Sequence, residues 1–316
     1  MRHPNFFLIG APKCGTTALA NWLAARPDVF MSPVKEPHHF NTDGGYPGVA
    51  DRAAYERLFD GAGAAHRAVG EASVGYLSSE VAVSNLLARY PEARLIACLR
   101  NPLDMLPSLH QQYVFNGTEP LGDFAEAWAA SERRRAEAWR APSGSDWQVF
   151  HYPRMGLLGA QVDRLFATAG PARCLILTLE EMNADPKGVF ARVLHHIGAA
   201  EGQIGPLGRA NAAKAARAPV LRALMTRAAA LKRRLGWTRS LGLARGIDRL
   251  NRVEQPWTPL PAPLSAEMAE TFRADIALLS RLLNRDFSYW LDPERKARPD
   301  AAHIPHDLER SGPGGA

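Results

Sequence analysis

Cysteine is scarce in this 316-residue chain, and the three that occur, Cys14, Cys98 and Cys174, are far apart. An odd number of scattered cysteines provides no disulfide framework, which excludes a small cross-linked secreted fold and fits a reducing cytoplasm. Cys98 and Cys174 fall within short apolar runs, so we expect both to be small core residues.

Long apolar runs are also missing, as is an N-terminal signal peptide, and we therefore expect a soluble cytoplasmic protein without a transmembrane segment. The chain has no internal repeat and is long enough to bury a substantial core. We predict one domain over residues 1–295 and a disordered tail over residues 296–316, which are rich in proline, glycine, alanine and charge.

Short apolar runs alternate with helical patterns along the chain. Strands are predicted at residues 6–9, 29–31, 94–100 and 173–178, because compact apolar runs of this length are typical of buried parallel strands. Amphipathic spacing between and after them predicts helices, one of which ends at Gly198. This alternation predicts an α/β domain with a mainly parallel sheet flanked by helices.

Residues 6–19 form the most informative stretch, which consists of a short strand, a loop framed by Gly10 and Gly15, and the start of a helix. A loop that leads into a helix N-terminus presents unpaired backbone N–H groups and the positive end of the helix dipole. Such a loop binds a cluster of anionic oxygens, so the sequence predicts a phosphate-like ligand here.

The lysine of this loop is displaced. A nucleotide-kinase P-loop has lysine directly after its second glycine, whereas here Thr16 takes that place and the cation is Lys13, inside the loop. This argues against ordinary ATP or GTP hydrolysis. Lys13 would lie beside the outer group of the bound anion and neutralise charge on a bridging oxygen. An incidental glycine turn is the alternative, but Pro12 and Thr17 add to the pattern and favour anion binding.

A second strand-to-helix junction lies at Arg100, the last residue of the predicted strand 94–100. Asn101 can cap and Pro102 can open the following helix, and Ser108 lies two turns into that helix. Arg100 then projects from the carboxyl end of a strand, where open α/β sheets bind ligands. An arginine fork and a hydroxyl suit a second phosphate, although either residue alone would be an ordinary surface side chain.

A third polar cluster, Lys35, Glu36, His38 and His39, follows the predicted strand 29–31. A carboxylate near a phosphate-like site offers a general base for an acceptor hydroxyl or amine. A solvated polar loop with a Lys–Glu pair is the alternative. The two histidines suggest zinc, but no nearby cysteine or carboxylate pattern completes a ligand set, so we expect no metal.

Together these motifs resemble those of sulfotransferases that use 3′-phosphoadenosine 5′-phosphosulfate (PAPS), in particular the bacterial and heparan-sulfate type of carbohydrate sulfotransferase. The string P-K-x-G-T-T-x-L from Pro12 is similar to the family's 5′-phosphosulfate loop, and L-R-N-P-x-x-x-x-x-S from Leu99 is similar to its 3′-phosphate motif. The resemblance implies a P-loop-type domain with about five parallel strands. The cofactor-binding residues that it implies are Lys13, Cys14, Gly15, Thr16, Thr17, Ala18, Arg100 and Ser108.

The same resemblance extends to two further segments. Lys35 to Phe40 is similar to the family string K-E-x-H-F-F, so Glu36 falls on the catalytic base and His38 on its neighbour in the acceptor site. Residues 69–77 look like G-E-x-[ST]-x-x-Y-[LF], in which Glu71 is either a second site carboxylate or a brace for the loops. Several relatives have a lysine after this glutamate, whereas this chain has Ala72, a departure from the heparan type.

Residues 209–252 are rich in alanine, lysine and arginine and carry much of the net charge of +6. They are predicted to form a basic helical lid over the nucleotide or a solvated helical hairpin. The resemblance implies that Lys214 and Arg217 close over the 3′-phosphate. Nucleic-acid binding is a weaker explanation because interleaved aromatic residues are missing, and peripheral contact with an anionic membrane stays open.

The resemblance implies transfer of a sulfuryl group from PAPS to a hydroxyl or amine, with a carbohydrate or small metabolite as the expected acceptor. Lys13, Glu36 and His38 would be the catalytic residues. One alternative is a P-loop nucleotide or small-molecule kinase, which the displaced Lys13 disfavours. The other is a non-catalytic nucleotide-binding protein, which would have no need of a base at Glu36.

Overall fold

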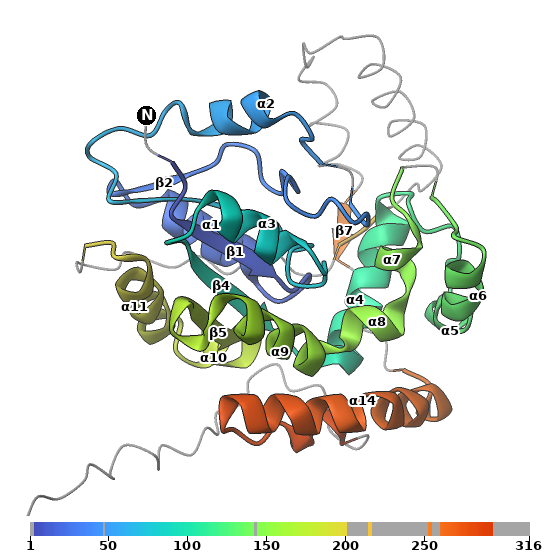
Figure 1. Ribbon diagram of the computed structural model, residues 1–316. Helices are drawn as coiled ribbons and strands as arrows, with labels where there is room; N and C mark the ends of the chain where they lie inside the picture. Colours follow the sequence, from blue (N-terminus) through green and yellow to red (C-terminus); the bar gives the residue numbers. More distant parts are fainter. Residues whose placement is uncertain are drawn as a thin grey trace, which may run out of the picture.

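In the computed structural model, residues 3–46, 48–141, 144–200, 214–216, 252–254 and 260–292 are described. At its centre lies a five-stranded sheet in the order β2-β3-β1-β4-β5, in which every neighbouring pair is parallel (Figure 1). The prediction of a mainly parallel sheet flanked by helices is confirmed. The strands are β1 (Phe6–Gly10), β2 (Val29–Met31), β3 (Ala68–Ala72), β4 (Arg94–Leu99) and β5 (Cys174–Thr178).

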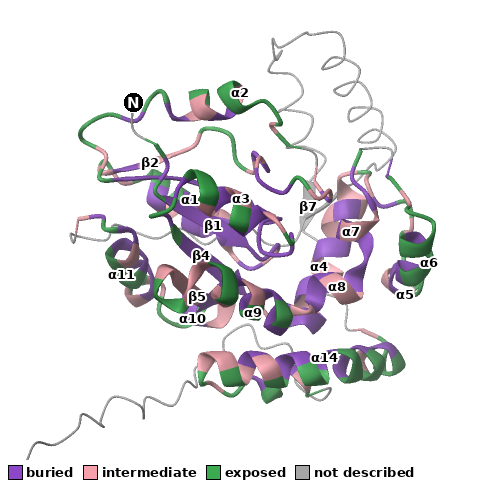
Figure 2. Cartoon of the chain, in the orientation of Figure 1, coloured by how far each residue is buried: buried purple, intermediate pink, exposed green. Residues whose placement is uncertain are grey.

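The central strands form the middle of the core. β1 is buried along its whole length, and β4 is buried from its second residue onward (Figure 2). Because successive side chains of a strand point to opposite faces, this burial requires cover on both faces of the sheet. Neighbouring strands also approach closely: a β-carbon at Gly70 of β3 would lie 2.4 Å from the ring of Phe6 in β1.

Some helices around the sheet begin or end at capping signals of the sequence. α4 begins where the Asn101 side chain accepts a hydrogen bond from the Leu103 amide, and it continues through Pro107. α11 ends at Gly198, whose left-handed backbone caps it as predicted. The described helices are α1 (Thr16–Ala24), α2 (Arg52–Glu56), η1 (Arg57–Phe59), α3 (Ala82–Arg89), α4 (Pro102–Phe115), α5 (Phe124–Ala129), α6 (Ser131–Ala136), α7 (Trp147–Phe150), α8 (Tyr152–Gly156), α9 (Leu158–Ala169), η2 (Pro171–Arg173), α10 (Leu179–Ala184), α11 (Pro186–Ile197), α14 (Ala262–Leu283) and η3 (Ser288–Leu291).

The C-terminal elements return to the start of α4. α14 packs along α9, and η3 follows it (Figure 1). Phe287 and Trp290 are fully buried, and the Trp290 carbonyl accepts a 2.7 Å hydrogen bond from the Asn101 side chain. Residues that are distant in sequence therefore support the helix that carries Ser108.

Short pieces of the basic segment are described. β6 (Lys214–Ala216) pairs antiparallel with β7 (Arg252–Glu254), and the β6 backbone lies beside α4. Arg217, the other residues of the predicted lid 209–252, and the predicted tail 296–316 lie outside the described residues. Of the cysteines, Cys98 is buried as predicted, whereas Cys174 at the start of β5 is half-buried.

Candidate active site

The loop between β1 and α1 has a backbone that suits an anion. Gly10 and Gly15 have φ angles of 150° and 84°, and Lys13 also has a positive φ, 62°. A side chain at Gly10 would collide with Leu77, whose β-carbon would lie 2.7 Å away. No side chain caps α1, and the amide of Leu19 bonds back to the Gly15 carbonyl. The amides that precede Leu19 in the first turn are thus available to a ligand.

Side chains of this loop divide into buried and accessible groups. The Cys14 thiol is buried against Met105, 3.6 Å from its sulfur, and this burial raises the pKa of Cys14 well above its ordinary value. Thr16 and Ala18 are also buried, whereas Thr17 is half-buried. Cys14 and Ala18 could therefore contribute only their backbone to a ligand.

The two predicted anion-binding motifs lie next to each other. Since β1 and β4 are parallel neighbours, their carboxyl ends meet at one edge of the sheet. The Arg100 guanidinium donates a 3.4 Å hydrogen bond to the carbonyl of Lys13. The Lys13 ammonium in turn donates a 3.3 Å bond to the side-chain oxygen of Gln112 on α4. The structure therefore brings the loop lysine and the strand-end arginine into one site.

Ser108 lies on the same side of α4 as Gln112, because residues four apart share a helix face. Its side chain is half-buried. Lys214 begins β6, the strand beside α4, so its backbone lies near the helix that carries Ser108. Gln112 was missed by the sequence analysis, although its spacing of four from Ser108 was a usable signal.

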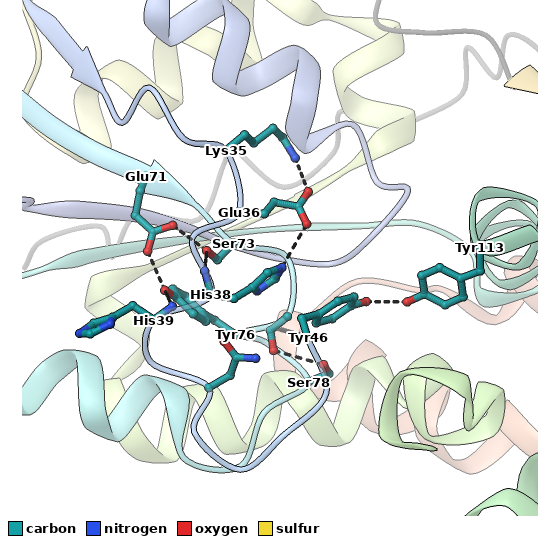
Figure 3. Close-up of polar contacts among 12 residues, drawn as sticks. Lys35, Glu36, His38, His39, Tyr46, Glu71, Ser73, Tyr76, Ser78 and Tyr113 are labelled. Carbon is teal, nitrogen blue, oxygen red and sulfur yellow. Dashed lines mark hydrogen bonds and ion pairs between the residues drawn. The ribbon is translucent and has the colours of Figure 1, made fainter. Parts of the chain in front are cut away.

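The segment that follows β2 carries the proposed base. Glu36 and His38 have φ angles of 63° and 46°, a left-handed conformation that costs a residue other than glycine about 1–3 kcal/mol. One carboxylate oxygen of Glu36 pairs with the Lys35 ammonium, and the other lies 3.2 Å from Nε2 of His38 (Figure 3). The loop thus places a carboxylate between two nitrogen groups.

Electrostatics keep Glu36 ionised. Partial burial alone would raise the pKa of this carboxyl, but the hydrogen bond from His38 and the positive charge of Lys35 outweigh burial and lower the pKa to about 2. The Glu36 side chain is 32 % exposed. At neutral pH it is therefore a carboxylate that a substrate proton can reach.

Aromatic packing orients the His38 ring. It stacks on Tyr46 with ring centroids 4.5 Å apart and planes 7° from parallel. The Tyr46 hydroxyl lies 2.7 Å from that of Tyr113 on α4 (Figure 3). Gly75 leaves room for this stack, since a β-carbon there would lie 2.5 Å from the Tyr46 ring. The sequence analysis missed both tyrosines, because no local pattern announces a contact between residues so far apart.

Glu71 lies beneath this loop and is fully buried. Its carboxylate accepts hydrogen bonds from Ser73 (2.7 Å), Tyr76 (2.8 Å) and Tyr55 (3.3 Å). Burial raises the pKa of Glu71, these hydrogen bonds oppose that effect, and the result is about 7. The neighbouring Ala72, also buried, accepts a bond from the Glu36 amide at its carbonyl. Of the two predicted roles of Glu71, these contacts support the brace.

Residues 3–207 match the sequence model of the sulfotransferase domain. The chain belongs to the sulfotransferase domain family. A crystal structure of a sulfotransferase from Alicyclobacillus acidocaldarius is 26 % identical, covers 92 % of this chain and 100 % of its own, and superposes with a TM-score of 0.68. The predicted P-loop-type α/β fold is confirmed by this likeness.

Curated relatives match over shorter lengths. Human heparan sulfate glucosamine 3-O-sulfotransferase 6 is 28 % identical over 199 residues, which are 62 % of this chain and 53 % of that protein. Human carbohydrate sulfotransferase 15 is 54 % identical over 35 residues, 11 % of this chain and 6 % of that protein. The chain of this sulfotransferase-family protein thus spans about half, or less, of the length of these relatives.

Within the described part of this family member, no helix combines the length and the apolar character that a bilayer crossing requires.

The adjacent histidines of the Glu36 loop have separate partners. His38 contacts Glu36, whereas Nδ1 of His39 lies 2.6 Å from the Val49 carbonyl. His38 and His39 therefore do not converge on one point.

Proposed function

We propose that this protein transfers a sulfuryl group from PAPS to a hydroxyl or amine of an acceptor. The observation that carries the proposal is the hydrogen bond from Arg100 to the carbonyl of Lys13. It places the strand-end arginine beside the phosphate-type loop, so that the two proposed anion sites are neighbours. Membership of the sulfotransferase domain family supports the same chemistry.

In this proposal, the 5′ end of the donor lies on the loop. The amides from Gly15 to Ala18, among them those of Thr16 and Thr17, would bind its oxygens at the N-terminus of α1. Arg100 and Ser108 would bind the 3′-phosphate. Lys214, whose strand lies beside α4, and Arg217 would close over that phosphate and add positive charge.

The donor supplies an activated sulfuryl group on a phosphate oxygen. Lys13, released from Gln112, would neutralise the negative charge that develops on that oxygen. Glu36 would accept the proton of the acceptor as its oxygen or nitrogen attacks sulfur, and His38 would hold the carboxylate by its 3.2 Å contact. Because the lysine–hydroxyl order that holds magnesium in P-loop kinases is absent, the proposal needs no metal.

A carbohydrate or a small metabolite is the proposed acceptor. The names of the matched relatives support a carbohydrate, since one acts on heparan sulfate glucosamine and one on carbohydrate. Kinase activity is disfavoured because Thr16 occupies the kinase lysine position. A purely non-catalytic binder would have no need of a carboxylate at Glu36.

Ligand-dependent stability tests the donor site. We expect 3′-phosphoadenosine 5′-phosphate (PAP) to raise the melting temperature far more than ADP or ATP at equal concentration, because only PAP occupies both anion sites. Scanning calorimetry with and without magnesium measures this directly. Equal stabilisation by ADP, or stabilisation that requires magnesium, would contradict the proposal and favour a kinase.

A further inference from the structure

Hydrogen bonds to residues that follow β3 hold the loop that carries Glu36 and His38. Its backbone is left-handed at both residues, so external contacts must keep it in place. The amides of His38 and His39 each donate a 3.0 Å hydrogen bond, to the Ser73 hydroxyl and the Tyr76 hydroxyl respectively. Two consecutive amide-bearing residues of the catalytic loop thus depend on two hydroxyl groups.

Both hydroxyl groups are hydrogen-bonded to one carboxylate. The Ser73 hydroxyl donates a hydrogen bond to Oε2 of Glu71, and the Tyr76 hydroxyl donates one to Oε1 (Figure 3). A hydroxyl has one hydrogen to donate, so a hydroxyl that donates it to the carboxylate can only accept hydrogen bonds from its other partners. The two loop amides are donors, and they therefore need hydroxyl groups held in this direction.

We propose that Glu71 is a positioning residue for sulfuryl transfer, whose carboxylate fixes the direction of the Ser73 and Tyr76 hydroxyls and through them the loop of Glu36 and His38. We name Glu71, Ser73 and Tyr76 the carboxylate clamp. This inference rests on the proposed function for its catalytic part. It assigns no contact between Glu71 and the substrate, since Glu71 is fully buried.

The clamp needs the ionised form of Glu71. A carboxylate only accepts hydrogen bonds, whereas a neutral carboxylic acid must also donate one. A proton on Glu71 would compete with that of Ser73 or Tyr76 and reverse one link. Burial raises the pKa of Glu71 to about 7, so the clamp is complete above that pH and is lost as the pH falls through it. The titratable groups that act on Glu71 are Tyr55, Tyr76 and Glu36, and His38 and His39 reach its hydroxyl partners through their backbone amides.

The loop carboxylate would not produce this pH dependence. The pKa of Glu36 is lowered to about 2, so Glu36 stays ionised throughout the range in which Glu71 titrates. An acid limb of turnover near neutral pH that disappears in Glu71→Gln would therefore report on the clamp. Glu71→Gln has no titrating carboxyl and should lack that limb.

Amide hydrogen exchange of the full chain, resolved by ¹⁵N NMR, tests the clamp without an acceptor. We expect Glu71→Gln to accelerate exchange at both His38 and His39 by about 10-fold or more, on the scale of a lost charge-assisted hydrogen bond. Ser73→Ala should accelerate His38 chiefly, and Tyr76→Phe His39 chiefly. Tyr55→Phe is the matched control, since the Tyr55 hydroxyl bonds Glu71 at 3.3 Å but no hydrogen bond is described from it to a loop amide.

Turnover and PAP binding complete the test. Glu71→Gln should lower kcat about 10-fold or more, without an acid limb near pH 7, and should keep wild-type affinity for PAP in calorimetry. Unchanged exchange at His38 and His39, or equal effects of Tyr55→Phe and Glu71→Gln, would overturn the clamp. Should the wild type fail to bind PAP, the proposed function falls, and the exchange rates still decide whether the clamp exists.

Discussion

At the scale of single residues, Glu36 and Lys13 have different environments although they serve one proposed reaction. Glu36 lies between Lys35 and His38, on the segment that follows β2. Lys13 belongs to that loop and contacts Gln112 of α4. One residue should therefore act on the acceptor, and the other on the donor.

Substitution of these two residues should separate their roles. Glu36→Gln keeps the shape of the side chain but removes the base, so we expect turnover to fall about 100-fold or more, with unchanged affinity for PAP. Lys13→Ala should weaken donor binding as well as turnover, because it removes a charge from the donor site. Titration calorimetry and steady-state rates measure the two effects; near-normal turnover of Glu36→Gln would show that another group is the base.

At the scale of elements, the site is an edge of the sheet to which four strand ends contribute. β1 leads to the anion loop, β4 leads to Arg100, β2 leads to the Glu36 loop, and β3 leads to the residues that support that loop. Parallel neighbours place these ends together without any special sequence signal. Loops from distant parts of the chain meet there for this reason.

Arg100 and Arg94 provide a matched pair at opposite ends of β4. Arg100→Ala should weaken PAP binding by about 1.5–3 kcal/mol, the scale of a hydrogen bond to a charged group, and leave ADP binding nearly unchanged. Arg94 is exposed at the first position of the strand, so Arg94→Ala should affect neither ligand. Calorimetry with both nucleotides tests this, and an equal loss of PAP and ADP affinity in Arg100→Ala would exclude Arg100 from the 3′-phosphate site.

The sequence predicted four of the five strands of the central sheet. β1, β2, β4 and β5 are compact apolar runs, and all were predicted for that reason; in β1 and β4 the run reflects burial on both faces. β3 was not predicted as a strand, since Gly70 and Glu71 are poor strand formers. It forms because Gly70 admits the Phe6 ring and because the Glu71 carboxylate finds three hydroxyl donors.

The site itself was predictable where local spacing carries the chemistry. The anion loop and the Arg100–Ser108 pair each lie within one strand-to-helix junction, so their motifs are continuous in sequence. The contacts that orient His38 come from Tyr46 and Gly75, and the contact to Lys13 comes from Gln112. Those pairings depend on tertiary packing, which no short motif encodes.

At the scale of the whole molecule, the C-terminal elements complete the domain although they follow the segment that matches the family. The family match ends at residue 207, yet Trp290 is fully buried and bonded to Asn101 at the head of α4. Stability and donor binding should therefore be linked through this contact.

Trp290 and Tyr289, neighbours with opposite exposure, test whether the buried tryptophan anchors η3. Trp290→Ala should lower the free energy of unfolding by about 3–5 kcal/mol, the range for a large buried aromatic side chain. Tyr289 is 44 % exposed, so Tyr289→Ala should cost much less. Urea denaturation of both variants measures the difference, and equal losses would show that η3 is not anchored by its buried tryptophan.

The most direct test of the central claim is transfer of label from [³⁵S]PAPS to a panel of carbohydrate, lipid, phenolic and peptide acceptors. The account predicts a labelled acceptor and stoichiometric PAP with the wild-type protein, without added magnesium, and a loss of both products with Glu36→Gln. Labelling from [γ-³²P]ATP with none from [³⁵S]PAPS would contradict it.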